Sequence, residues 1–210
     1  MIFQRNETFR GYLKAYPVTS FILAMNLVVF LLDHWVLDRM LSEWGAFVQH
    51  PYYESYGLYG LGEPWRYITS IALHAGWDHL LFNSFSILIF APPLERLLGH
   101  FRYIVYYLLA GIAGNALTAI VNAGSVYASL GASGAIYGLF GAYLFLAIFR
   151  KFALDEATRK TIFISIVFGV TYSILVPKVN IWAHLGGALA GFGLMGLFVA
   201  SKTRKYKRGV

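Results

Sequence analysis

The chain of 210 residues contains no cysteine and few charged residues. Without cysteine it has neither disulfides nor thiolate ligands for a metal, and nothing follows about its redox compartment. Charged residues make up 13% of the chain, whereas a soluble domain of this length would carry about 25%. Hydrophobic residues make up 58%, and the mean hydropathy is +0.59. This deficit of charge indicates a protein whose solvent is lipid.

Six apolar stretches are long enough to cross a bilayer, which takes about 20 residues each. They are Pro17–Leu37, Trp77–Leu97, Phe101–Val121, Ala132–Phe149, Thr161–Val176 and Ile181–Ala200. We therefore expect an all-α membrane protein with six transmembrane helices. The second stretch contains Pro92-Pro93, which should kink or end its regular part. The first long connection is rich in Trp, Tyr and Gly, as is typical of a segment at the membrane interface.

Basic residues predict the orientation. Placing the termini and the even-numbered connections on one side gathers fourteen Lys and Arg there, against three on the other side. The fourteen are Arg5, Arg10, Lys14, Arg96, Arg102, Arg150, Lys151, Arg159, Lys160, Lys202, Arg204, Lys205, Lys207 and Arg208, and the three are Arg39, Arg66 and Lys178. By the positive-inside rule, both termini are cytoplasmic.

The same placement bears on partners and on domain organisation. The basic residues stand at the ends of apolar stretches rather than on one face, which indicates lipid headgroups and not nucleic acid as their partners. We expect residues 1–16 to form a cytoplasmic N-terminal segment that is not a cleaved signal peptide. Residues 17–200 then form the membrane domain, and residues 201–210 form a basic cytoplasmic tail.

Four polar residues fall at one depth of this arrangement. Stretches two, four and six all run from outside to inside, and each carries a polar residue within about its first two turns. These residues are His79 with Asn83, Ser133 and His184. A polar or ionisable side chain at membrane depth is costly, so its default interpretation is functional. Their convergence predicts a site just below the outer surface.

Ser133 stands in Gly131-Ala132-Ser133-Gly134, where the fourth stretch begins. Such small residues can serve helix packing alone. For Ser133 itself we favour a nucleophile, because the neighbouring glycines leave its hydroxyl uncovered. A helix N-terminus also places free backbone N–H groups beside it, which suit a developing oxyanion.

His184 opens the sixth stretch and is the candidate general base, although a lone intramembrane histidine can also be a hydrogen-bonded structural residue. Gly187 and Gly191 follow it at i+3 and i+7, so one helix face can press against a glycine-rich neighbour. The fourth stretch is the natural candidate. That packing would bring His184 to Ser133, as base catalysis requires.

His79 and Asn83 are spaced i, i+4 and point to one side of their helix. They can donate to an oxyanion, or they can be interhelical hydrogen-bond partners. A metal site is not expected from His74, Asp78, His79 and His184, since no second carboxylate and no His-Glu-x-x-His motif accompany them. No carboxylate is placed to orient His184, so a Ser–His dyad is favoured over a triad. We expect no cofactor.

With these motifs in order, the chain resembles the rhomboid family of intramembrane serine proteases in its minimal six-helix form, over roughly Pro17 to Ala200. The matching motifs are Trp65-Arg66, His74-x-x-x-x-His79-x-x-x-Asn83, Glu95-x-x-x-Gly99, Gly131-Ala132-Ser133-Gly134 with Tyr137, and Ala183-His184 with Gly187 and Gly191. The chain departs from the family at Pro92-Pro93, because an uninterrupted second helix is usual there.

The resemblance implies a six-helix protease domain over residues 17–200 and a role for each matching residue. Ser133 would be the nucleophile, and His184 would act first as base and then as acid. His79, Asn83 and the Ser133 backbone N–H would form the oxyanion hole, and Gly131 would shape the backbone there.

The remaining matches would support the site. Tyr137 would stack on the catalytic histidine, and Trp65, Arg66 and Glu95 would be structural. The resemblance further implies that substrates are single-span membrane proteins, cut near the outer membrane surface after a small residue. We therefore expect a multi-pass protein of a prokaryotic plasma membrane, with its site opening towards the extracytoplasmic face.

Two other functions compete with this interpretation. A catalytically inactive relative that binds membrane proteins is disfavoured because Ser133 and His184 are both present. A small transporter or channel would carry polar residues along a path through the bilayer, whereas here they cluster at one end. The short fifth stretch is a candidate gate for substrate. The natural substrate and the oligomeric state stay open.

Overall fold

The computed structural model describes residues 2–3, 6–52, 55–150, 154–177 and 179–208, and these are mostly helical. The long helices are α2 (Pro17–Trp35), α5 (Trp77–Leu98), α6 (His100–Val121), α7 (Ser133–Phe149), α8 (Glu156–Leu175) and α9 (Ile181–Arg208). The short elements are α1 (Phe9–Ala15), α3 (Met40–Gly45), β1 (Phe47–Gln49), η1 (Leu58–Gly60), α4 (Arg66–Thr69), η2 (Ser70–Ala72) and β2 (Tyr127–Ser129).

The long helices coincide with the six predicted stretches. Among the described residues, five of them (α2, α5, α6, α8 and α9) are long and apolar enough to cross a membrane, and α7 is a shorter apolar helix. The count of six spans and the cytoplasmic termini stay predictions. Arg5, Lys151 and Lys178, used for the orientation, lie outside the described residues, as do residues 209–210 of the expected tail. Helix α9 continues through the rest of that tail to Arg208.

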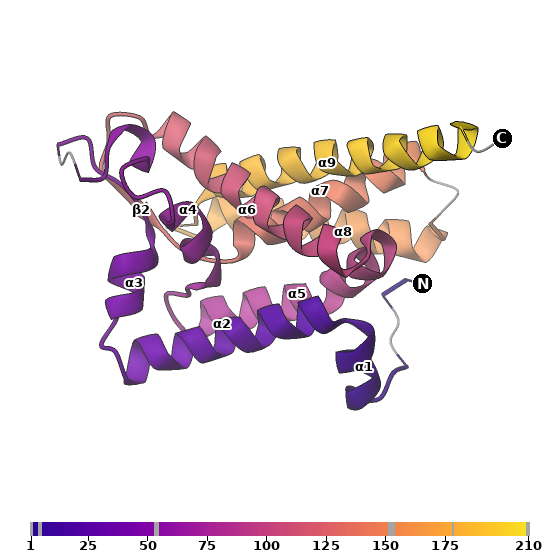
Figure 1. The fold of residues 1–210 in the computed structure, drawn as a ribbon, viewed down its shortest axis with the longest axis horizontal. Helices are drawn as coiled ribbons and strands as arrows, with labels where there is room; N and C mark the ends of the chain where they lie inside the picture. The colour runs from indigo at the N-terminus through magenta and orange to yellow at the C-terminus, as the bar shows by residue number, and fades with distance from the viewer. Residues whose placement is uncertain (1, 4–5, 53–54, 151–153, 178, 209–210) are drawn as a thin grey trace.

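The connecting elements and the chain termini lie at opposite ends of the helices. Figure 1 shows α3, α4 and β2 at one end, and both the N- and the C-terminus at the other. Helices α5 and α7 begin at the end that carries the short elements, and α9 also begins there. The predicted site residues stand near the starts of these three helices, so they share this end.

Helix α7 lies in the middle of the molecule, packed against α5, α6 and α9. Its glycines allow this because side chains would keep the helices apart: Gly138 faces Ala110 of α6, and Gly141 faces the Ala188 carbonyl of α9. Helices in lipid gain no hydrophobic free energy from association, so close backbone packing has to hold them together. The small residues of α7 supply that close packing.

Of the two effects predicted for Pro92-Pro93, a kink or an end of the second helix, the end is wrong. Helix α5 is continuous from Trp77 to Leu98 and contains both prolines. Two prolines remove two backbone donors, but neighbouring helices can compensate for this in a membrane protein. The carbonyls that lose their helical donor are those of Leu88 and Ile89, and Tyr143 of α7 donates a hydrogen bond of 2.7 Å to the next carbonyl, that of Phe90, which ties α5 to α7 at this point. Ala91, Pro92 and Leu94 are buried, so packing on this stretch outweighs the lost bonds.

Glu95 joins α2 to α5 at the end away from the predicted site. Its buried carboxylate accepts hydrogen bonds from the backbone N–H groups of Val18 and Thr19 and from the Thr19 hydroxyl. The Nδ1 of His100 lies 2.7 Å from Oε1 of the same carboxylate. A buried carboxylate needs such partners, and the contacts fit the structural role that the resemblance implies.

Arg66 stabilises the long connection between α2 and α5. Its guanidinium is buried and donates bonds of 2.8 Å to the carbonyls of Glu43 and Ala46, and it pairs with Glu63. Trp65 stacks on Trp44 with ring centroids 5.8 Å apart. These contacts hold α4 against α3 and the residue that follows it, as a structural role requires.

A small sheet was not expected in the first connection. Strand β1 pairs antiparallel with β2, with Phe47 opposite Ser129. Three-residue strands are too short to show an alternating pattern in the sequence. Because β2 leads directly into α7, the pairing fixes the chain just before Ser133.

Candidate active site

Ser133 is the first residue of α7 and is partly buried. The chain before it is held by the β1–β2 pairing and by a bond of 2.9 Å from the Gly131 N–H to the Ser70 carbonyl. Gly131 has a φ of +134°, a conformation that residues with a Cβ rarely adopt. The turn therefore needs glycine, and it leaves the N–H groups of the first turn of α7 without helical partners, as at any helix start.

His79 and Asn83 of α5 face this turn from the other side. A Cβ built on Gly131 would lie 2.7 Å from His79 Nε2 and 3.7 Å from Asn83 Nδ2. The Ala75 N–H points to His79 Nδ1 at 3.4 Å, so the neutral ring carries its proton on Nε2, towards Gly131. Asn83 Nδ2 is buried and has no hydrogen-bond partner among the described residues. Two donors are thus available beside the backbone of the turn that precedes Ser133.

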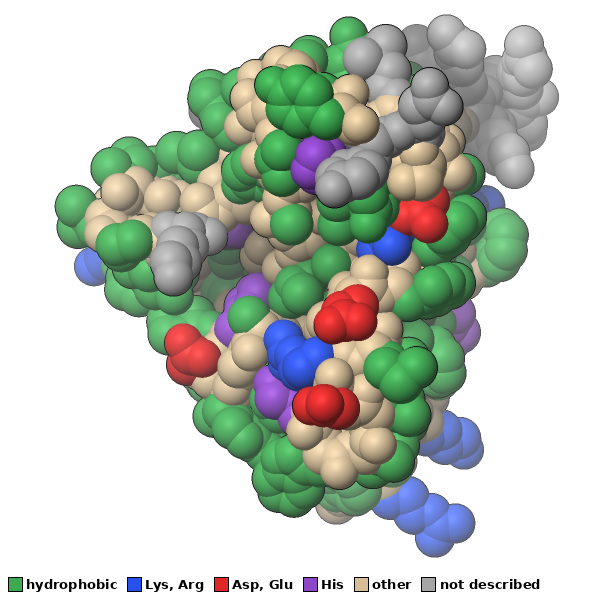
Figure 2. All heavy atoms as spheres, turned by 90° about the vertical axis from the view of Figure 1, so that its left-hand side faces the viewer, with side chains coloured by type: hydrophobic (Ala, Val, Ile, Leu, Met, Phe, Trp, Pro, Cys, Tyr) green, Lys and Arg blue, Asp and Glu red, His purple; other side chains and the backbone are tan. Residues whose placement is uncertain are grey.

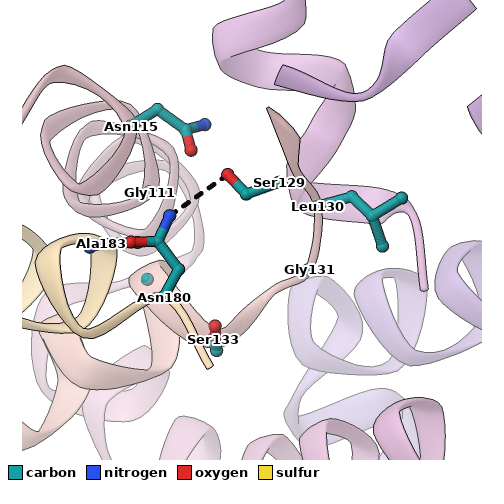
Figure 3. Close-up of a pocket in the computed structure, with 9 residues that line it drawn as sticks. Gly111, Asn115, Ser129, Leu130, Gly131, Ser133, Asn180 and Ala183 are labelled. Carbon is teal, nitrogen blue, oxygen red and sulfur yellow. Dashed lines mark hydrogen bonds between the residues drawn. The ribbon is translucent and has the colours of Figure 1, made fainter. Parts of the chain in front are cut away.

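His184 lies in the first turn of α9 and is 5% exposed. Asn180 sets the start of this helix, because its Oδ1 accepts a bond of 3.0 Å from the Ala183 N–H. The Nδ2 of Asn180 donates to Thr118 of α6 at 3.0 Å. It also donates to Ser129 of β2 at 3.2 Å (Figure 3). The base-bearing helix is therefore fastened to the strand that leads to Ser133.

The glycine contacts between α7 and α9 pack the helix that carries Ser133 closely against the helix that carries His184. A side chain on Gly187 would collide with the Gly134 carbonyl, and one on Gly191 would collide with the Gly138 carbonyl. The Tyr106 hydroxyl lies 2.7 Å from the Gly138 carbonyl and 2.8 Å from the Gly191 carbonyl, so its single proton is shared between acceptors on both helices and links them to α6. Gly134, which follows Ser133, also lies against Ala183, which precedes His184: a Cβ on Gly134 would lie 3.4 Å from the Ala183 carbonyl oxygen. The two helices thus pack through their glycines, as the glycine spacing predicts.

Two side chains hold the ring of His184. Tyr137, one turn after Ser133 on α7, stacks on it with centroids 3.9 Å apart and planes 8° apart. Ser173 of α8 places its Oγ 2.7 Å from His184 Nδ1. Sequence reasoning placed Tyr137 there through the resemblance but did not find Ser173. A signal existed: Ser173 is a polar residue near the outer end of an apolar stretch, at the depth where the other site residues gather.

A small pocket lies beside Ser133. It is lined by Gly111, Asn115, Ser129, Leu130, Gly131, Ser133, Gly134, Asn180 and Ala183. Figure 3 shows the polar side chains of Asn115, Ser129 and Asn180 gathered across the pocket from Ser133. Figure 2 looks onto this end of the molecule and shows it hollowed, with histidine side chains close to the hollow.

His74 precedes α5 and lies next to His79, with ring centroids 5.1 Å apart. Its side chain is buried, and this burial, together with the neighbouring His79, lowers the pKa of His74 to about 3. His74 is therefore a neutral ring at the working pH of an enzyme near neutrality. In the described part of the chain, no group of three or more His, Cys, Asp or Glu is arranged to hold a metal ion.

The arrangement combines a serine hydroxyl at a helix start, a histidine on an adjacent helix and hydrogen-bond donors beside the backbone turn that precedes the serine. These are the parts that nucleophilic acyl transfer needs.

Comparisons with known proteins point in the same direction. The family model described as the rhomboid domain matches residues 61–201. The chain is 41% identical over 206 residues to "Putative rhomboid protease YdcA" of Bacillus subtilis (strain 168), covering 98% of this chain and 100% of that protein. It is 34% identical over 131 residues to the rhomboid protease GluP of the same organism, covering 62% of this chain and 25% of GluP. It is also 37% identical over 133 residues to the mitochondrial RHOMBOID-like protein 6 of Arabidopsis thaliana, covering 63% of this chain and 43% of that protein.

Proposed function

This chain belongs to the rhomboid family, and from that premise we propose that it is an intramembrane serine endopeptidase working through a Ser133–His184 dyad. The observation that carries the proposal is the α7–α9 contact, in which Gly134, next to Ser133, packs against Gly187, one turn after His184, and against Ala183, just before it. Tyr137 supports it further, because a residue on the helix of the nucleophile stacks on the candidate base.

The chemistry follows from the groups present. Ser133 Oγ attacks the carbonyl carbon of the scissile peptide, and its proton passes to His184 Nε2. The oxyanion that forms accepts hydrogen bonds from His79, Asn83 and the Ser133 N–H. The tetrahedral intermediate collapses, the C–N bond breaks, and the imidazolium of His184 gives its proton to the leaving amine. Water then hydrolyses the acyl-enzyme, with His184 again acting as base.

The proposed substrates are single-span membrane proteins. A helical peptide bond is shielded by its own backbone hydrogen bonds, so the substrate has to unwind into a hydrated cavity before hydrolysis. The pocket beside Ser133 is narrow and bordered by glycine backbone, which suits a small side chain before the cleaved bond.

We place the protein in a prokaryotic plasma membrane with the site opening outward. An inactive, binding-only protein is not favoured, because nucleophile and base are both present.

The direct test compares detergent-purified wild type and Ser133→Ala with several single-span substrates. We expect the wild type alone to cut, near the outer end of the substrate helix, and a fluorophosphonate probe to label Ser133. If folded wild type cuts no substrate and the probe leaves Ser133 unlabelled, the protease proposal is wrong and binding without cleavage becomes the better explanation.

The oxyanion donors should have a smaller effect than the dyad. We expect His79→Ala and Asn83→Ala each to lower kcat by about 10²- to 10³-fold, the usual cost of removing one such donor. Each variant should retain measurable turnover and probe labelling. The control is Ser86→Ala on the same helix, whose hydroxyl bonds the Phe82 carbonyl. Complete loss in either variant, with folded protein, would contradict a role limited to donation.

A further inference from the structure

We propose that Ser173 of α8 is a positioning residue for the base: it holds His184 in the tautomer with the proton on Nδ1, so that Nε2 is free to accept the proton of Ser133. The inference rests on the proposed protease function. It adds a third residue, from a third helix, to the proposed pair.

The contacts of Ser173 carry the argument. Its side chain is buried, 7% exposed, and its Oγ lies at the centre of three polar contacts. His184 Nδ1 is 2.7 Å away, the Tyr137 hydroxyl is 2.7 Å away, and the Gly169 carbonyl of the same helix is 2.8 Å away. The two aromatic partners are themselves stacked, so the hydroxyl bridges both rings of one stacked pair.

Counting protons assigns the tautomer. A serine hydroxyl has one proton to donate and two lone pairs to accept with. The Gly169 carbonyl can only accept, so Ser173 donates its proton there. Its lone pairs then accept from the Tyr137 hydroxyl and from His184 Nδ1–H. All three contacts are satisfied in this arrangement, whereas donation to Nδ1 would leave the Gly169 contact without a proton.

The hydrogen bond between Ser173 and His184 becomes stronger when His184 is charged during the reaction. When Nε2 takes the proton of Ser133, the ring becomes an imidazolium and both ring nitrogens are donors. A buried donor without an acceptor is costly, and a bond from a charged donor is stronger than one from a neutral donor. Ser173 therefore stabilises the charged ring as well as orienting the neutral one, in the place where other hydrolases use a carboxylate.

Through the contact between Ser173 and His184, catalysis also depends on the position of α8. Ser133 and His184 stand on α7 and α9, whereas Ser173 stands on α8 near its outer end. A displacement of α8 would remove the acceptor from His184 and leave the dyad residues themselves in place.

The test uses two nearly isosteric substitutions in full-length protein, Ser173→Thr and Ser173→Val, because only threonine keeps the hydroxyl. We expect Ser173→Thr to keep kcat/KM within a few-fold of the wild type. Ser173→Val should lower it by about 10- to 100-fold, mainly in kcat, the range expected for one hydrogen bond to a charged group. Labelling of Ser133 by a fluorophosphonate should slow in parallel. Ser165→Ala, elsewhere on α8, is the control and should match the wild type.

The pH profile separates positioning from a general loss of structure. In Ser173→Val the acid limb of kcat/KM should move to lower pH, since the imidazolium loses an acceptor and is harder to form. A merely structural defect would lower activity at every pH without moving the limb. Equal activities and equal profiles for the threonine and valine variants would overturn the proposal.

A measurement on unmutated protein keeps the proposal testable if the variants fail to fold. Nitrogen NMR of wild type labelled at histidine, assigned with His184→Gln, should show His184 protonated at Nδ1 above the pH where the ring charges. Protonation at Nε2 instead would overturn the proposal whether or not the protein cleaves a substrate. Failure of the protease proposal has a different signature, namely wild type that neither cleaves nor reacts with the probe.

Discussion

Replacing Ser133 or His184 by alanine is expected to reduce turnover almost to nothing, and replacing both is expected to cost no more than replacing either one. We expect each single variant to lose about 10⁴- to 10⁶-fold in kcat, as in other serine hydrolases. The reason is that neither residue works alone: Ser133 is a weak nucleophile without a base, and His184 has no proton to take without the serine hydroxyl. Once one is missing, the other contributes nothing further to the reaction.

The measurement is kcat for one substrate with the wild type, both single variants and the double variant, each checked for folding. Independent contributions would instead make the losses multiply, so the double variant would fall to the product of the two. Turnover by Ser133→Ala well above that of the double variant would also contradict a shared mechanism. Ser165→Ala, a serine on α8 away from these contacts, serves as the matched control and should leave kcat unchanged.

The helices and most of the candidate site could be predicted because lipid makes the sequence easy to interpret. Apolar stretches of sufficient length have few alternatives to a helix in a membrane, and α2, α5 and α6 appear where expected. Polar residues inside such stretches stand out, so the sequence alone is enough to single out Ser133 and His184. Glycines at helical spacing then indicate which helices pack, and Gly187 does lie against α7.

The features that the sequence analysis missed depend on tertiary contacts, for which the local sequence carries a weak signal, as at Ser173, or none. Ser173 is one polar residue in a short stretch, and only the packing of α8 on α9 brings it to His184. The β1–β2 pairing joins segments far apart in the chain. Pro92-Pro93 was given its local effect on a helix, but α5 continues through both prolines, in a stretch that is buried against its neighbours and tied to α7 by Tyr143. In each case, contacts with neighbouring elements determine the structure more than the local sequence does.

Gly187→Ala should damage both folding and catalysis, although it adds a single methyl group. The new Cβ would collide with the Gly134 carbonyl and lie 2.8 Å from the carbonyl carbon. Backbone atoms of a packed helix cannot rotate away as a side chain can, so α7 and α9 must move apart. Forcing atoms into a packed interior costs about 1–3 kcal/mol. The movement occurs one residue from Ser133, and a misplacement of about 1 Å can cost about 10²-fold in rate.

Gly193→Ala provides the matched comparison, because it makes the same change on the same helix. A Cβ on Gly193 meets no heavy atom within 4 Å, and alanine favours a helix over glycine by up to about 1 kcal/mol. We expect Gly193→Ala to keep wild-type kcat with an equal or higher Tm, and Gly187→Ala to lose at least about 10²-fold in kcat with a lower Tm. If both variants were equally stable and active, the close α7–α9 contact would not be what brings Ser133 and His184 together. A loss of kcat that persists well below the Tm of Gly187→Ala would show instead that the glycine sets the geometry of the dyad, and not only the stability of the helix pair.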